Sequence, residues 1–130
     1  MSNNKNISVE IALPYKAMDA IKADKVVIPT ENGDSVTILD ERAPTVFMIK
    51  AGLLQILNNE NKLIEQYYIS SGICNYAEKK CTIAVSNAID TNISYKEAEK
   101  LFEETKIPDE KEFYTAICDC IKLDKINQYK

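Results

Sequence analysis

Residues 24–57 constrain the fold most, because short apolar runs alternate there with residues that stop regular structure. The runs cover residues 26–28, 36–39 and 46–49. They are separated by Pro29, Gly33, Pro44 and Gly52. Short runs that are rich in β-branched residues and bounded by proline or glycine predict strands joined by turns. The loops at residues 30–35 and 40–44 have polar tips, and we expect any recognition surface there first.

The segments on either side extend the β pattern. Residues 7–13 alternate apolar and polar side chains, which predicts a half-buried strand that Pro14 ends. Two hairpins are predicted, with polar tips at residues 58–61 and 77–80. Residues 17–21 fit either a short strand or a turn of helix. Many short strands with turns about every 8–12 residues are typical of an all-β sandwich or barrel.

The apolar period changes to that of a helix after residue 92. Ser94 and Glu97 have the spacing of a capping box, and Pro108 starts a second helix after a break. The apolar stripes comprise Ala98, Leu101, Phe102 and Thr105, then Phe113, Ile117, Cys120, Ile121 and Leu123. The prediction is a mainly β fold with α, in which a β-sandwich domain (residues 1–92) precedes an antiparallel helical hairpin domain (residues 93–130).

Composition excludes several function classes. The net charge of -4 argues against nucleic-acid binding, which depends on neutralising phosphates. No window approaches the roughly 20 apolar residues of a membrane span, and the opening residues lack a signal peptide. The chain has no histidine, which is the commonest general base near neutral pH. Its three glycines are too few for a dinucleotide-binding fingerprint. We expect no catalytic residue, no cofactor and no metal.

Four cysteines, Cys74, Cys81, Cys118 and Cys120, are predicted to be reduced thiols that serve as small apolar side chains. Cys118 and Cys120 are two residues apart and would point to opposite sides of a helix, which argues against a zinc site. If residues 77–80 form a turn, Cys74, Tyr76, Cys81 and Ile83 share one face of the hairpin. A thiol-based redox protein is a further hypothesis, weakened by the lack of a C-x-x-C motif.

Several short motifs occur in one order and spacing. They are Ile28-Pro29, residues 31–33, Ile38-Leu39, Ala43-Pro44, residues 50–52, residues 69–73 and residues 81–85. Together they resemble the ATP synthase epsilon chain, which is called the delta chain in mitochondria, over roughly residues 7–105. The resemblance favours a strand at residues 17–21. Thr30 and Ser71 stand where the family has glycine, Asp40 replaces a proline and Arg42 replaces a histidine, so we expect turn geometry to differ locally.

The resemblance implies a non-catalytic central-stalk subunit of a proton-translocating F-type ATP synthase. Its partners would be the gamma chain and the c-ring, with the hairpin able to reach the alpha and beta chains. It would lie on the cytoplasmic face of a bacterial inner membrane, held there through the complex. Glu31 and Asp34 are candidates for contact with the ring. The alternative is that they are surface charges that only solvate a turn. Arg42 and Pro44 are candidates for the interface with gamma, or Arg42 is an ordinary loop charge.

The resemblance also bears on nucleotide binding and inhibition. Residues 39–43 match an ATP-binding pattern of some relatives, but they precede the hairpin on which that pattern functions. On the hairpin, Ser94 and Glu97 replace its aspartate and arginine, so we predict no ATP binding. Residues 94–112 carry four lysines against seven acids, which predicts weak or absent autoinhibition. A rival hypothesis is a free-standing β-sandwich module that binds a peptide or a small ligand.

Overall fold

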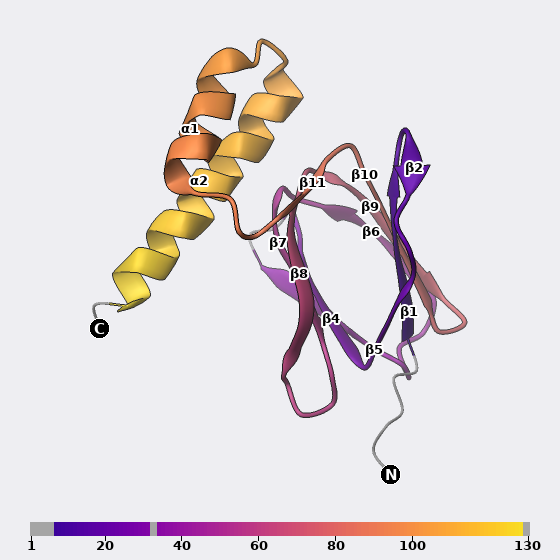
Figure 1. Cartoon of the computed structure of the whole chain (residues 1–130). Coiled ribbons are helices and arrows are strands. Elements are labelled where there is room, and N and C mark those ends of the chain that lie inside the picture. The colour runs from indigo at the N-terminus through magenta and orange to yellow at the C-terminus, as the bar shows by residue number, and fades with distance from the viewer. Residues whose placement is uncertain (1–6, 32–33, 129–130) are drawn as a thin grey trace.

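The computed structural model describes residues 7–31 and 34–128, and side chains of the last helix as far as Leu123. Within these residues, two β-sheets stack face to face and two helices lie beside one of them (Figure 1). The predicted combination of an N-terminal β-sandwich and C-terminal helices is therefore confirmed.

The two sheets draw their strands from distant parts of the chain. The first sheet has the order β2 (Lys16–Ala17), β1 (Ile7–Leu13), β10 (Lys80–Val85), β9 (Gly72–Ala77) and β6 (Thr45–Ile49), with β3 (Ile21–Ala23) also paired to β1. The second has the order β11 (Ala88–Asp90), β8 (Leu63–Ile69), β7 (Gly52–Leu57), β4 (Lys25–Pro29) and β5 (Ser35–Leu39). The β1–β10 pair is parallel and the other pairs are antiparallel.

The turns that close the two predicted hairpins use residues in the left-handed region. Glu78 (φ 50°) and Lys79 (φ 66°) form a two-residue turn between β9 and β10, as primed hairpin turns require. In the other tip, Asn61 has a φ of 62°, and the Asn58 side chain accepts hydrogen bonds from the backbone N–H groups of Glu60 and Lys62 at 2.9 Å. Both predicted tips are confirmed.

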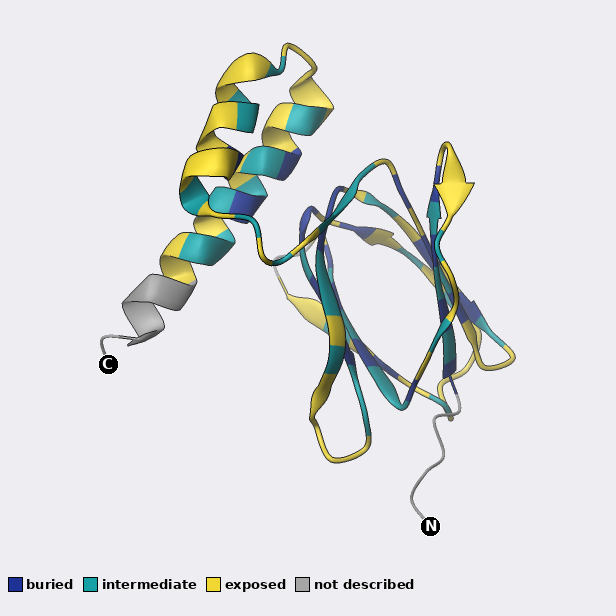
Figure 2. Ribbon diagram, in the orientation of Figure 1, coloured by how far each residue is buried: buried dark blue, intermediate teal, exposed yellow. Residues whose placement is uncertain are grey.

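The sandwich core comes from alternate residues of each strand. In β1, Ile7, Val9, Ile11 and Leu13 are buried and the intervening residues are half-buried, as the alternation predicts (Figure 2). Cys74, Tyr76, Cys81 and Ile83 are also buried together in this core, which confirms the predicted shared face of the β9–β10 hairpin.

The helices α1 (Tyr95–Glu104) and α2 (Pro108–Gln128) form the predicted antiparallel pair. The Ser94 hydroxyl accepts a hydrogen bond from the Glu97 N–H at 3.2 Å, which caps α1. Between the helices, the Thr105 hydroxyl donates to the Glu110 carboxylate at 2.7 Å. The short connection is therefore fixed by side chains of its own.

Three sequence predictions need correction or limitation. Residues 16–23 hold two very short strands, β2 and β3, instead of one strand or a helical turn, because each pairs with a different part of β1. Leu123 is predicted to lie on an apolar stripe, but its side chain is 63% exposed, because the antiparallel helix α2 extends beyond the first turn of α1 (Figure 1). The expected turn at Gly33 lies outside the described residues.

Candidate functional site

The β4–β5 loop carries the first pair of predicted contact residues. The Thr30 N–H and hydroxyl both donate to the Asp34 carbonyl, each at 3.0 Å, which closes the loop tightly. Thr30 is buried, and its φ is not positive, so a side chain is accommodated where the family has glycine. Glu31 and Asp34 are exposed and free to meet a partner.

The β5–β6 loop carries the second pair. Arg42 and Pro44 are exposed there, and the Arg42 guanidinium donates to the Thr37 carbonyl at 3.5 Å. The Tyr76 hydroxyl donates to the Asp40 carbonyl at 2.9 Å, which ties this loop to the sandwich core. Burial is the main cause that raises the pKa of Tyr76, with a further contribution from the charge of Asp40. Tyr76 therefore stays protonated as a donor.

The structure does not bring the two loops together. They lie at opposite ends of β5, whose five residues span about 17 Å at the usual rise per residue. Asp34 lines a groove together with Asp119 and Cys120 of α2, whereas Arg42 follows the opposite end of β5.

An apolar row crosses the outer face of the first sheet, and sequence reasoning missed it. Strand register aligns Met48 with Ile73, Ile73 with Ala84, Ala84 with Ala12, and Ala12 with Ala17. We call these five residues the outer row. Met48 is 50% exposed and Ile73 45%, and the neighbouring Val46 is 65% exposed. A hollow of about 410 Å³ lies over the alanines beside Pro14.

A contiguous exposed apolar surface usually marks a site of contact with another macromolecule. The signal in the sequence was the apolar run at residues 46–49, which is apolar at both alternating positions. Phe47 and Ile49 point into the core, so Val46 and Met48 must point outward. The rest of the row is visible only when distant strands are aligned.

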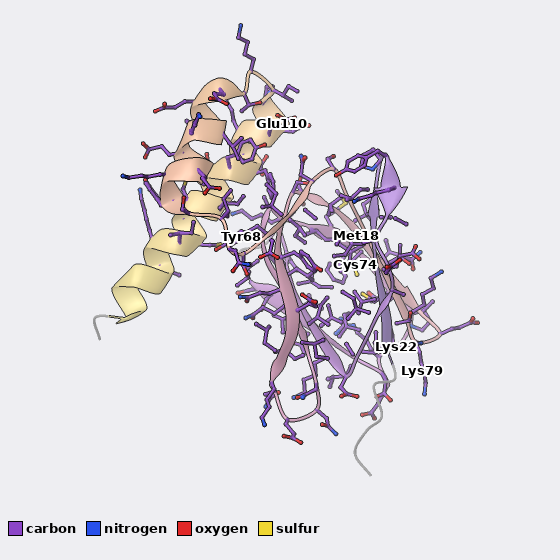
Figure 3. The ribbon with its side chains drawn as sticks, in the orientation of Figure 1. Met18, Lys22, Tyr68, Cys74, Lys79 and Glu110 are labelled. Carbon is purple, nitrogen blue, oxygen red and sulfur yellow. The ribbon has the colours of Figure 1, made fainter. Side chains whose placement is uncertain are left out.

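A second apolar contact holds the hairpin against the second sheet. Phe113 and Ile117 of α2 and Ala98 of α1 cluster with Tyr68 of β8, which lies on the side of that sheet facing the helices (Figure 3). Beside this contact is an open groove of about 740 Å³, lined by Asp34, Lys50, Asp119 and Cys120 among others. The groove is open and its lining carries both positive and negative charges, so it does not indicate a particular ligand.

The described residues contain no cluster of three or more histidine, cysteine, aspartate or glutamate side chains that could hold a metal ion. None of the four cysteines is in a disulfide. Cys118 and Cys120 line different grooves, as expected for residues on opposite sides of a helix. Across residues 7–31 and 34–128, no helix is both long and apolar enough to cross a bilayer.

Comparison with known proteins gives the family. Residues 6–91 match the family model described as ATP synthase, Delta/Epsilon chain, beta-sandwich domain. The ATP synthase epsilon chain of Granulibacter bethesdensis is 29% identical over 94 residues, which cover 72% of this chain and 68% of that one. The epsilon chain of Gluconacetobacter diazotrophicus is 26% identical over 82 residues, covering 63% of this chain and 57% of that one. The chain thus spans about two thirds or less of the length of these relatives.

Solved structures share the fold. One chain in the mitochondrial ATP synthase of Euglena gracilis, solved as OSCP/F1/c-ring, aligns with a TM-score of 0.66 and 20% identity over 87% of this chain and 75% of that one. A chain in the central stalk/c-ring of the Tetrahymena thermophila enzyme aligns with a TM-score of 0.61 and 16% identity over 88% and 96%. With the family match over most of the sandwich, the chain belongs to the ATP synthase delta/epsilon family.

Proposed function

We propose that this chain is a non-catalytic central-stalk subunit of a proton-translocating F-type ATP synthase. It would join the gamma chain to the c-ring, so that rotation of the ring turns gamma during ATP synthesis. Family membership supports this role, as do similar chains solved within central-stalk and c-ring assemblies. The observation that carries the proposal is the outer row, an exposed apolar surface on a close-packed sandwich.

The outer row is the surface that we assign to the gamma chain. Val46 and Met48 lie on β6, directly after the loop that holds Arg42 and Pro44. The loop adds one planar cation, the Arg42 guanidinium, which can bind a carboxylate through two hydrogen bonds. A stiff sandwich attached through such a surface transmits torque with little deformation.

Glu31 and Asp34 are the residues that we assign to the c-ring. Both carboxylates are exposed on a loop whose backbone is fixed by Thr30. A carboxylate opposite an arginine of a ring loop makes a strong directional contact. The double change Glu31→Gln/Asp34→Asn should weaken recovery of the ring, whereas Glu60→Gln, at an exposed hairpin tip, should not. Equal recovery of the ring with both variants would mean that Glu31 and Asp34 only solvate their turn.

The helical hairpin, residues 93–130, forms the second domain of this proposal, after a sandwich domain of residues 1–92. Its excess of acids over lysines opposes docking on an acidic loop of the catalytic chains, so inhibition of hydrolysis is weak or absent. Ser94 and Glu97 stand where the ATP-binding pattern has aspartate and arginine, so the isolated chain does not bind ATP. Deletion of residues 93–130 should leave the hydrolysis rate of the assembled complex nearly unchanged. A several-fold rise in the rate would contradict this part of the proposal.

We place the chain on the cytoplasmic face of a bacterial inner membrane, held there by its partners. The test is affinity purification of the tagged full chain from detergent-solubilised native membranes. Gamma, c-ring and catalytic beta chains should co-purify in constant ratio. Recovery of the tagged chain alone, or with an unrelated peptide or small ligand, would favour a free-standing binding module instead.

A further inference from the structure

Cys74 and Cys81 face each other inside the sandwich, and the proposed coupling role uses neither of them. Their sulfur atoms are 3.7 Å apart, and both residues are fully buried. Cys74 is opposite Ile83 and Cys81 is opposite Tyr76 in the β9–β10 register, so the two thiols are diagonal neighbours on one face. Figure 3 shows Cys74 within the layer of core side chains.

The surroundings make the two thiols unequal. A hydrogen bond between the two thiols lowers the pKa of Cys74, burial opposes this shift, and the positive charge of Arg42 adds to it. The same hydrogen bond, followed by burial, raises the pKa of Cys81. Cys74 is therefore the better nucleophile of the pair.

We propose that Cys74 and Cys81 form an oxidation site, at which a hydroperoxide converts the two thiols into a reversible disulfide between β9 and β10. The Cys74 sulfur attacks the peroxide, the O–O bond breaks, and the leaving oxygen takes up the thiol proton as an alcohol or water. The Cys81 sulfur then attacks the resulting sulfenic acid. The S–S bond forms as the S–O bond breaks, and hydroxide leaves with the Cys81 proton as water. Two thiols are oxidised, and one peroxide is reduced.

The two sulfurs are already in van der Waals contact. A disulfide holds its sulfurs about 2.05 Å apart, so the pair must close by about 1.6 Å within a packed core. Exchange with a small thiol can reduce such a bond again.

Access to the pair requires local opening of the sandwich. Phe47 of the edge strand β6 pairs with Cys74, so separation of this edge uncovers the thiols without global unfolding. The oxidation rate should consequently rise in urea concentrations below those that unfold the chain.

The test uses the full chain with Cys118→Ser and Cys120→Ser, because both of these thiols are outside the sandwich core. After treatment with hydrogen peroxide and alkylation in denaturant, the expected product is a monomer that has lost two hydrogen atoms and carries no alkyl group. Lys79 and Lys80 lie between the cysteines, so trypsin should release two peptides joined by the disulfide. Dithiothreitol should separate them. Two alkylated thiols after peroxide, or sulfinic acid without a crosslink, would overturn the proposal.

A matched pair of variants tests the order of the steps. In Cys81→Ser, the Cys74 sulfenic acid should persist and react with dimedone, whereas Cys74→Ser should give little dimedone adduct. Far-UV circular dichroism checks that each variant is folded. If neither serine variant folds, the same peptide mapping on the wild-type chain still decides whether the Cys74–Cys81 crosslink forms.

Discussion

The sandwich core and the contact between the hairpin and the sandwich differ in how they are secured. The core joins buried side chains from both sheets into one large cluster, supported by ladders between strands distant in sequence. The hairpin is attached through a small cluster around Phe113, Ile117 and Tyr68. The described salt bridges, Lys62–Glu60 and Lys100–Glu104, do not cross this contact. The difference implies that the sandwich unfolds as one unit, whereas the hairpin can detach by itself.

Gly72→Ala should have the largest effect, because it forces a side chain into the β9–β10 ladder. A Cβ at Gly72 would lie 2.0 Å from the Ala84 carbonyl oxygen and 2.9 Å from a Val85 methyl group. Neither backbone can move without breaking the pairing, so the loss should exceed about 3 kcal/mol. Urea unfolding followed by circular dichroism measures it.

Gly52→Ala is the matched control, since its Cβ would meet only the Pro29 side chain at 3.2 and 3.3 Å. We expect a loss of about 1 kcal/mol there. Similar losses at the two glycines would contradict the view that the ladder at Gly72 tolerates no side chain.

Phe113→Ala should lower the free energy that holds the hairpin against the sandwich by about 3 kcal/mol, and it should leave the stability of the sandwich itself unchanged. Hydrogen exchange should speed up throughout α1 and α2 while strands β1 and β10 keep their protection. Phe102→Ala is the control, because Phe102 is only half-buried on α1. Loss of protection in the sandwich strands would show that the two regions unfold together.

Ser70→Ala should cost about 2 kcal/mol, because it removes the shared acceptor of two backbone N–H groups. The Ser70 hydroxyl accepts hydrogen bonds from the backbone N–H groups of Ser86 and Asn87, each at 3.0 Å. The neighbouring Ser71 is exposed, and Ser71→Ala should be almost neutral. Thermal unfolding of the two variants side by side checks the difference.

Ser94→Ala should have the smallest effect, about 1 kcal/mol, by removing the cap of α1. The loss should appear as fraying of the first turn of α1 in hydrogen exchange, with the sandwich unchanged. Ser94→Asp keeps an acceptor at the cap and should restore protection. If it does not, the hydrogen bond to Glu97 contributes little to the hairpin.

Local patterns predicted much of this fold. The alternation of apolar and polar residues predicted the buried face of β1. The polar tips predicted both hairpins, and Ser94 predicted the start of α1. Strand β11 was missed because Ala88–Asp90 is short and lacks a clear alternation. The parallel pairing of β1 with β10 was not predicted, because no local signal links residues so far apart.

The candidate site was predicted only as separate pieces. The exposure of Glu31, Asp34, Arg42 and Pro44 follows from their polar loops. Their placement at opposite ends of β5 follows from the predicted strand between the two loops. The outer row depends on a register among β6, β9, β10, β1 and β2, which no local pattern contains. The proximity of Cys74 and Cys81, by contrast, arises within the local β9–β10 hairpin, whose shared face was predicted.

We propose that the chain binds the gamma chain through the outer face of its first sheet. The most direct measurement is the amount of gamma chain that co-purifies with tagged Met48→Glu, compared with tagged Leu63→Glu. Met48 and Leu63 are similarly exposed, at 50% and 47%, but Leu63 begins β8 in the other sheet. A carboxylate buried without a partner at position 48 should reduce recovery of gamma by about tenfold or more, with Leu63→Glu near wild type. Equal recovery of gamma with the two variants would contradict the claim.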